Sequence, residues 1–307
     1  ENVVFLPGIP LHPSVRATGA LEEAVQADLI LAASPAQHMR SVLRAAKPHL
    51  PARPAIALCA KGVERGTLAL MTEVLAEELP EVTPAVLSGP GFAKDVARGL
   101  PTATTIASPD AALAQRIVAT IGLPTFRPYV ADDLVGAEIG GAVKNVIAIA
   151  CGVAEGRKLG DGARAALITR GFAELTRLGL AMGAKAETLS GLCGLGDLVL
   201  TCASLTSRNT SLGAALGEGR KLKDILAERR SVAWQGARYE ARMVLVHRGA
   251  FPPRCGVGAA RLTSDPNDAA VESTALSCSR RSTRNPRRRS RSRRGASWSR
   301  RSCTSAR

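Results

Sequence analysis

The first 130 residues alternate short apolar runs with segments in which apolar residues recur at helical spacing. Residues 28–33 predict a buried strand that ends before Pro35, and residues 36–50 predict an amphipathic helix. The same order of strand and helix then repeats. Further strands are expected at 55–59, 85–87, 102–107 and 125–130, and helices at 68–79, from Ala93, and at 111–121.

Near-continuous apolar strands separated by helices are typical of a parallel sheet that is covered on both faces. From about Asp132 the strand pattern stops, and helical patterns continue through Leu226. Glycine-rich turns are expected at 160–162, at Gly183 and at 191–196. The pattern therefore predicts an α/β layer with a parallel, Rossmann-like sheet, followed by an all-α domain.

The basic charge of the chain is concentrated near its C-terminus. The net charge is +15, but residues 234–307 hold 17 of the 41 Lys and Arg, all arginine, and only 4 of the 26 acidic residues. The remaining body is nearly neutral, so its charge does not indicate a nucleic-acid-binding protein. Apolar periodicity also stops in the tail. The tail is either the product of a shifted reading frame in a GC-rich gene or a native Arg/Ser segment, disordered and able to bind polyanions.

Lys144 is the most informative single residue, because it lies in the apolar helical run 139–149. A buried ammonium must reach water or meet a partner, and burial lowers its pKa towards neutrality. Gly140 and Gly141 precede it by one turn, where glycine costs roughly 1 kcal/mol each relative to alanine. A ligand that approaches the backbone beside Lys144 explains both features. A pair of helix-packing glycines with a snorkelling lysine explains them as well.

Two polar segments follow predicted strands, at the edge of the sheet where ligands bind in doubly wound folds. Lys61 follows the strand at 55–59, and residues 88–91 follow the strand at 85–87. The second segment leads into a short helix, whose first backbone amides are suited to an anion or a cofactor phosphate.

Two further segments carry polar side chains in the helical half. Residues 191–198 are glycine-rich but lack the order of a dinucleotide fingerprint and follow no strand, so we interpret them as a tight turn that presents Asp197. Ser207, Arg208 and Asn209 offer a hydroxyl, a guanidinium and an amide in succession, a suitable donor set for phosphate.

These motifs together resemble bacterial NAD(P)-dependent glycerol-3-phosphate dehydrogenase, in order and spacing, from residue 2 to about 233. The resemblance rests on the segments 5–8, 60–62, 88–90, 140–146, 167–171, 194–202 and 207–209. It implies hydride transfer between NAD or NADP and C2 of sn-glycerol 3-phosphate, which gives dihydroxyacetone phosphate. This reaction supplies glycerol 3-phosphate for phospholipid synthesis.

The resemblance also implies roles for individual residues. Lys144 matches the proton-transferring residue, and Asp197 lies near it, with Thr201 and Asn145 as neighbours. The implied substrate-binding residues are Lys61, Gly89, Gly91, Ser207, Arg208 and Asn209. The implied cofactor-binding residues are Lys61, Ala93, Arg208 and Val232. No metal ligand is implied, and a homodimer is suggested by the family alone.

Three departures from the family pattern affect these expectations. Gly91 stands where the family commonly has a hydroxyl residue, so only its backbone can contact the substrate. In the family, a first strand and a glycine-rich loop precede the segment that corresponds to residue 1, and this sequence contains neither. The resemblance ends after Ala233, where Trp234 follows. We therefore expect an incomplete dinucleotide-binding domain at 1–130, a helical substrate and catalytic domain at 131–233, and an aberrant tail at 234–307. The chain as written should then bind dinucleotide poorly and be inactive.

Other features predict a soluble cytoplasmic protein. No signal-peptide pattern opens the chain, and the longest apolar stretch, 146–154, is far shorter than a membrane helix of roughly 20 residues. Cys59, Cys151, Cys193 and Cys202 lack metal-type spacing, as is common for reduced thiols. Two alternatives stay open: a related two-domain 3-hydroxyacid or sugar-acid dehydrogenase, which the phosphate donor set disfavours, and a non-catalytic relic whose tail binds nucleic acid.

Overall fold

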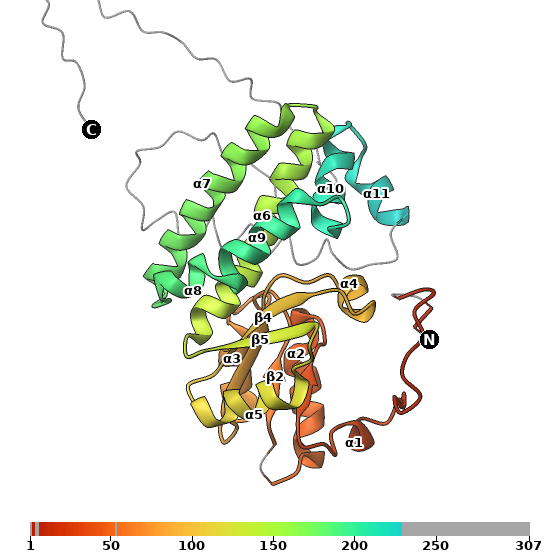
Figure 1. The fold of residues 1–307 in the computed structure, drawn as a ribbon, viewed down its shortest axis with the longest axis vertical. Coiled ribbons are helices and arrows are strands. Elements are labelled where there is room, and N and C mark those ends of the chain that lie inside the picture. The colour runs from red at the N-terminus through yellow and green to blue at the C-terminus, as the bar shows by residue number, and fades with distance from the viewer. Residues whose placement is uncertain (1, 4–5, 53, 229–307) are drawn as a thin grey trace, which may run out of the picture. The chain divides into compact units, whose positions relative to one another are not determined.

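A computed structural model describes residues 2–3, 6–52 and 54–228 of the chain. Val232 and the tail at 234–307 lie outside these residues. The first part of the described chain is a five-stranded sheet with helices on both sides (Figure 1). Its strands are β1 (Ile30–Ala32), β2 (Ile56–Leu58), β3 (Pro84–Ser88), β4 (Thr102–Ala107) and β5 (Phe126–Ala131). Its helices are α1 (Leu21–Ala24), α2 (Ala36–Ala46), the short 3-10 helix η1 (Lys47–His49), α3 (Met71–Glu78), α4 (Ala93–Ala97) and α5 (Ala111–Ile121).

The strand order is β1-β2-β3-β4-β5, and one pairing differs from the all-parallel sheet that the sequence predicts. β1, β2 and β3 are parallel, but β4 pairs antiparallel with β3, through Val86 opposite Ala107 and Ser88 opposite Thr105. β5 is again parallel to β4. A parallel return needs a crossover that covers one face of the sheet. α4, the one helix between β3 and β4, has five residues and buries none of them, so the chain turns back instead.

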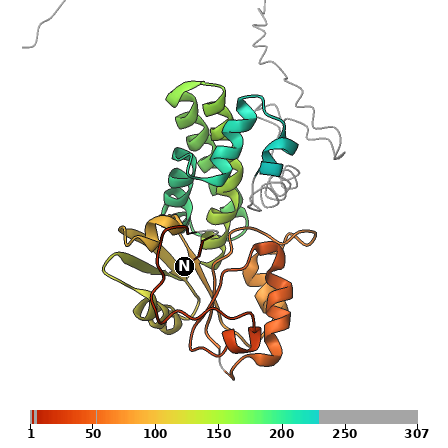
Figure 2. The ribbon, with the colours of Figure 1, turned by 90° about the vertical axis from the view of Figure 1, so that its right-hand side faces the viewer.

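Helices lie on both sides of the sheet (Figure 2). Alternating side chains of the sheet pack against helices on these opposite faces. Ile56 and Leu58 of β2 join the core formed with α2 and α3, whereas Ala57 between them joins the core formed with α5. β2 is therefore buried on both sides, which explains its continuous apolar sequence. Lys61, three residues beyond this strand, is thus attached to the rigid centre of the sheet.

The second part of the described chain is helical. It contains α6 (Leu134–Gly156), α7 (Gly160–Ala181), α8 (Ala186–Ser190), η2 (Leu192–Gly196), α9 (Asp197–Ala203), α10 (Arg208–Gly217) and α11 (Leu222–Glu228). Asp133 accepts a hydrogen bond from the Gly136 amide and so caps α6. The fold class is thus confirmed in its main features, a Rossmann-like and mostly parallel sheet followed by helices.

Two of the glycine-rich segments are not turns. Gly160, Asp161 and Gly162 form the first turn of α7, and residues 192–196 form a π-helical turn, η2, that continues directly into α9. One glycine of η2 is needed for close packing, since a Cβ on Gly194 would overlap the carbonyl group of Leu189. A glycine in such a segment can therefore reflect contact between backbones, as Gly194 does, and not chain reversal.

α6 is the central helix of the second part and packs against α7, α9 and α10. Among the described residues, α6 is the one single helix that is long and apolar enough to cross a membrane. However, 67% of its most apolar 18-residue stretch is buried inside the protein. Its apolar residues, among them Ile139, Val143 and Ile147, form a core with Leu175, Leu189 and Leu198. Its apolar composition is therefore accounted for by packing.

Candidate active site

Lys144 lies in the middle of α6 and meets a carboxylate. Its side chain is buried, with 7% of the residue exposed, and Nζ lies 2.5 Å from Oδ1 of Asp197. Asp197 is 1% exposed and is the first residue of α9. Of the two possibilities for a buried ammonium, to reach water or to meet a partner, the ion pair shows the second. The partner is the aspartate that follows the glycine-rich segment.

Lys61 approaches the same carboxylate from the sheet. Its Nζ donates to Oδ2 of Asp197 at 2.7 Å and to the carbonyl oxygen of Gly89 at 2.8 Å. One carboxylate therefore lies between two ammonium groups, one from the segment after β2 and one from α6. This convergence of Lys61, Lys144 and Asp197 could not be inferred from spacing, because 136 positions separate Lys61 from Asp197 in the chain.

The two glycines before Lys144 are each required by a different contact. A Cβ on Gly140 would overlap the carbonyl oxygen of Cys193, so Gly140 allows η2 to pack directly on α6. A Cβ on Gly141 would lie 3.2 Å from Cγ of Lys61 and 3.3 Å from Oγ of Ser88. Gly141 thus leaves room for the Lys61 side chain. Helix packing accounts for the first glycine, and an approach to the site accounts for the second.

The loop after β3 forms another wall. Gly89 has a φ of +151°, and a Cβ there would lie 2.9 Å from Cα of Thr104, so β4 excludes a larger residue. Thr104 donates from Oγ1 to the carbonyl oxygen of Ser88 at 2.9 Å. Gly91 follows in the loop, and Ala93 is the first residue of α4. These contacts fix the carbonyl group of Gly89, which accepts from Lys61.

Ser88 belongs to the segment 88–91 that the sequence places at the edge of the sheet, but the sequence assigns it no role of its own, and in the structure it is the last residue of β3. It is 2% exposed, and its Oγ has no hydrogen-bond partner among the described residues. Buried hydroxyls are normally hydrogen-bonded. An unpartnered hydroxyl beside Lys61 and Gly141 therefore indicates a ligand or a water at this edge of the sheet. A single serine in a strand gives no sequence signal for this role.

The electrostatics of the site favour proton exchange at Lys144. Burial, as the largest cause, and the charge of Lys61 lower the pKa of Lys144, whereas Asp197 raises it, and the balance leaves this pKa at about 8. The two ammonium groups and one carboxylate leave a net positive charge, which suits an anionic substrate. A lysine with this pKa exchanges its proton readily near neutral pH.

The Ser207, Arg208 and Asn209 set lies at the start of α10, which packs along α6. Asn209 donates from Nδ2 to Oδ1 of Asn145 at 2.7 Å, so it contacts the residue that follows Lys144. Ser207 instead caps α10, because its Oγ accepts from the Thr210 amide. Thr201 is likewise occupied, since its hydroxyl donates to the backbone oxygen of Asp197 at 2.7 Å.

No group of three or more His, Cys, Asp or Glu side chains within the described ranges is arranged to hold a metal ion. Cys59, Cys151, Cys193 and Cys202 are free thiols. The side chains that converge at the site are those of Lys61, Lys144 and Asp197.

Comparison with known proteins identifies relatives of both halves. Two family models match, described as the N-terminus (residues 1–114) and the C-terminus (residues 133–248) of NAD-dependent glycerol-3-phosphate dehydrogenase. The second match continues to residue 248. The resemblance to the family therefore extends beyond Ala233, where the sequence motifs predicted that it ends.

Individual relatives agree with these models. A glycerol-3-phosphate dehydrogenase (NAD(P)+) of Parvibaculum lavamentivorans is 62% identical over 233 residues, which are 76% of this chain and 70% of the relative. The enzyme of the same name from Caulobacter vibrioides is 55% identical over 266 residues, or 86% of this chain and 80% of the relative. The crystal structure of the Coxiella burnetii glycerol-3-phosphate dehydrogenase has a TM-score of 0.76 and 40% identity, covering 80% of this chain and 76% of that one.

Proposed function

This chain belongs to the NAD-dependent glycerol-3-phosphate dehydrogenase family, and from that premise we propose the chemical role of each residue at its site. The protein is an oxidoreductase that interconverts sn-glycerol 3-phosphate and dihydroxyacetone phosphate with NAD or NADP. This assignment takes the place of the two alternatives, the hydroxyacid dehydrogenase and the non-catalytic relic.

The observation that carries the proposed mechanism is the contact of both lysines with Asp197. Oxidation of a secondary alcohol needs a base for the hydroxyl proton. Lys144, with a pKa of about 8, takes this proton in its neutral form and returns it as an ammonium in the reverse reaction. Asp197 holds the Lys144 amino group by the 2.5 Å contact and so orients it.

The substrate carries a phosphate, and the charge of the site suits it. Lys61 and Arg208 supply positive charge from the sheet and from the start of α10, and Asn209 adds an amide beside Asn145. Ser207 contributes by capping α10, and its hydroxyl is already used. We therefore assign substrate binding to Lys61, Arg208 and Asn209, with the backbone of Gly89 and Gly91 as a wall.

The residues present fit a nicotinamide cofactor at the same edge of the sheet. The unpartnered Ser88 hydroxyl is a polar group that a bound ligand would satisfy. Lys61, Ala93 and Arg208 would hold the cofactor, and Val232 lies outside the described residues. When bound, the nicotinamide accepts or donates the hydride at C2 of the substrate.

Replacement of Lys144 tests the mechanism. The test uses a full-length enzyme, in which the family's first strand and glycine-rich loop and an in-frame C-terminus are restored. In this enzyme, Lys144→Ala should lower kcat for dihydroxyacetone phosphate reduction by at least ~10², because a general acid is lost. Lys223→Ala, at an exposed position of α11, is the matched control and should keep the activity. Circular dichroism and the melting temperature verify that both variants fold. A folded Lys144→Ala enzyme with most of its activity would refute the acid–base role.

Family resemblance also supports a homodimer in the cytoplasm. Light scattering coupled to size-exclusion chromatography measures the oligomeric state directly, and a mass of one chain at micromolar concentration would contradict the dimer.

A further inference from the structure

Lys61 is followed by a loop that has neither helix nor strand until α3 begins at Met71. Leu68 in this loop has a φ of +63°, a conformation that non-glycine residues rarely adopt. Two internal backbone hydrogen bonds link its halves, from the Leu68 amide to the Glu64 oxygen at 3.0 Å and from the Glu64 amide to the Ala69 oxygen at 2.9 Å. A loop of this kind keeps its shape only when neighbouring elements support it.

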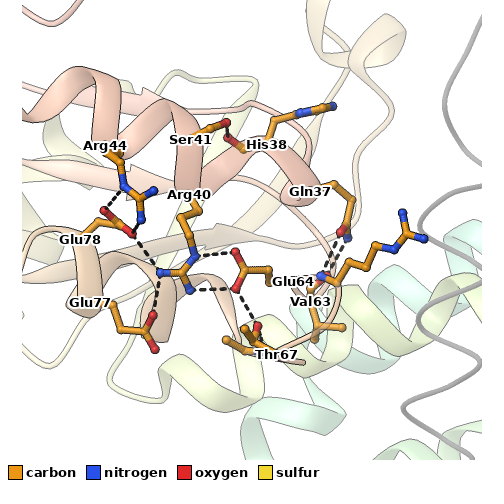
Figure 3. Close-up of polar contacts among 12 residues, drawn as sticks. Gln37, His38, Arg40, Ser41, Arg44, Val63, Glu64, Thr67, Glu77 and Glu78 are labelled. Carbon is orange, nitrogen blue, oxygen red and sulfur yellow. Dashed lines mark hydrogen bonds and ion pairs between the residues drawn. The ribbon is translucent and has the colours of Figure 1, made fainter.

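α2 supplies that support through one uncharged side chain (Figure 3). Gln37 donates from Nε2 to the Val63 carbonyl at 2.8 Å and accepts at Oε1 from the Arg65 amide at 2.9 Å. The amide group of Gln37 therefore binds two peptide groups of the loop, on either side of Glu64. Such a contact fixes the path of the main chain.

Arg40, one turn further along α2, binds the side chain between those peptide groups (Figure 3). Its Nε and Nη2 donate to the two carboxylate oxygens of Glu64 at 2.7 and 2.8 Å, as a bidentate pair. Glu64 also accepts from the Thr67 hydroxyl at 2.6 Å, and the Arg40 guanidinium is the main cause of a lowered pKa of Glu64. Arg40 itself is anchored to α3, by Glu77 at 2.6 Å and Glu78 at 3.0 Å.

We propose that Gln37 and Arg40 are positioning residues, which hold Lys61 against Asp197 and Gly89 by fixing the loop at 63–67. The proposal rests on the function assigned above to the lysine pair. Lys61 lies two residues before Val63, and its ammonium contacts are 2.7 and 2.8 Å long, so a shift of about 1 Å in the loop would break them. Neither Gln37 nor Arg40 contacts Lys144 or Asp197, and their effect is transmitted through Lys61.

This arrangement has a measurable consequence at Lys144. The titratable groups that face Lys144 are Lys61 from the loop, Asp197 from the start of α9 and the neutral Cys202 thiol further along α9. Lys61 lowers the pKa of Lys144, whereas Asp197 raises it. Release of Lys61 would therefore raise the pKa of Lys144. A network that only joined α2 to α3 would leave this pKa unchanged.

Two arginines of α2 provide a matched comparison. Arg40→Gln removes the contact with the loop. Arg44 lies on the same helix as Arg40, and Arg44→Gln removes its ion pair with Glu78 of α3 but leaves the loop contacts intact. The pKa of Lys144 is followed by NMR of lysine Nζ and Cε in the full chain, with Lys144→Ala to assign the signal. The pH dependence of kcat/KM is measured in the full-length enzyme.

We expect Arg40→Gln to raise the Lys144 pKa by at least half a unit, to lower kcat/KM about tenfold, and to speed amide hydrogen exchange at 62–67. Arg44→Gln should change none of these. Equal Lys144 pKa values in the two variants would overturn the proposal. If Arg40→Gln does not fold, Gln37→Met applies the same test without loss of charge. If the wild-type pH profile lacks the Lys144 ionisation that NMR detects, the proposed function fails, while the NMR comparison still decides the positioning role.

Discussion

Two ionisable side chains of α6, Glu138 and Lys144, are buried, and burial shifts their pKa values in opposite directions. The pKa of Glu138 is raised to about 7 and that of Lys144 is lowered to about 8, with desolvation as the largest cause in each case. Lys144 could be singled out from the sequence, because a lysine in an apolar run is conspicuous. Glu138 could not, since its partner Thr72 lies 66 positions away and a glutamate near the start of a helix is common.

Glu138 should make the stability of the protein depend on pH. It accepts from the hydroxyl and the amide of Thr72 at the start of α3. Because its folded pKa of about 7 exceeds the ordinary glutamate value of 4.5, its stabilising contribution is full below pH 4.5 and is lost as pH rises through 7. The unfolding free energy of the wild type, relative to Glu138→Gln, should therefore fall by roughly 3 kcal/mol between these limits. Urea denaturation at several pH values measures the difference, and a constant difference would show that Glu138 ionises normally.

At the scale of elements, the apolar pattern located the strands and most helices, but not their directions or their fine structure. β4 and α5 have the predicted bounds, 102–107 and 111–121. A buried strand has the same sequence of apolar residues in a parallel and in an antiparallel pair. The apolar pattern therefore could not predict that β4 runs antiparallel to β3. The π-helical turn η2 was also hidden, because glycines that permit close packing resemble glycines that form turns.

The contact between α6 and α10 allows a test of such close packing. A Cβ on Gly152 would overlap the carbonyl oxygen of Thr210, which is backbone and cannot move aside easily. Gly152→Ala should therefore lower the unfolding free energy by roughly 1–3 kcal/mol. Gly162→Ala in α7, where nothing lies within 4 Å, should instead raise it by about 0.5–1 kcal/mol. Urea denaturation of both variants provides the measurement, and equal effects would argue against backbone contact between the helices.

At the scale of the whole molecule, the site joins side chains that are far apart in the sequence. The motifs predicted the residues Lys61, Lys144 and Asp197, and the structure brings their side chains together. The family models agree with the family that these motifs indicate. The ion pairs among them and the support of the loop by α2 depend on how the sheet packs against α6 and α9. Patterns of local spacing carry no information about contacts of that range. The assignment of Val232 and the tail at 234–307 remains a prediction from sequence.

The central claim is that Lys144 exchanges the proton of the substrate hydroxyl, and the pH dependence of kcat/KM in both directions tests it most directly. Oxidation of glycerol 3-phosphate needs neutral Lys144, and reduction of dihydroxyacetone phosphate needs the ammonium. The free enzyme should therefore oxidise faster as pH rises through about 8 and reduce more slowly over the same range. An oxidation rate that shows no such step, or a step near 8 that persists in Lys144→Ala, would contradict this account.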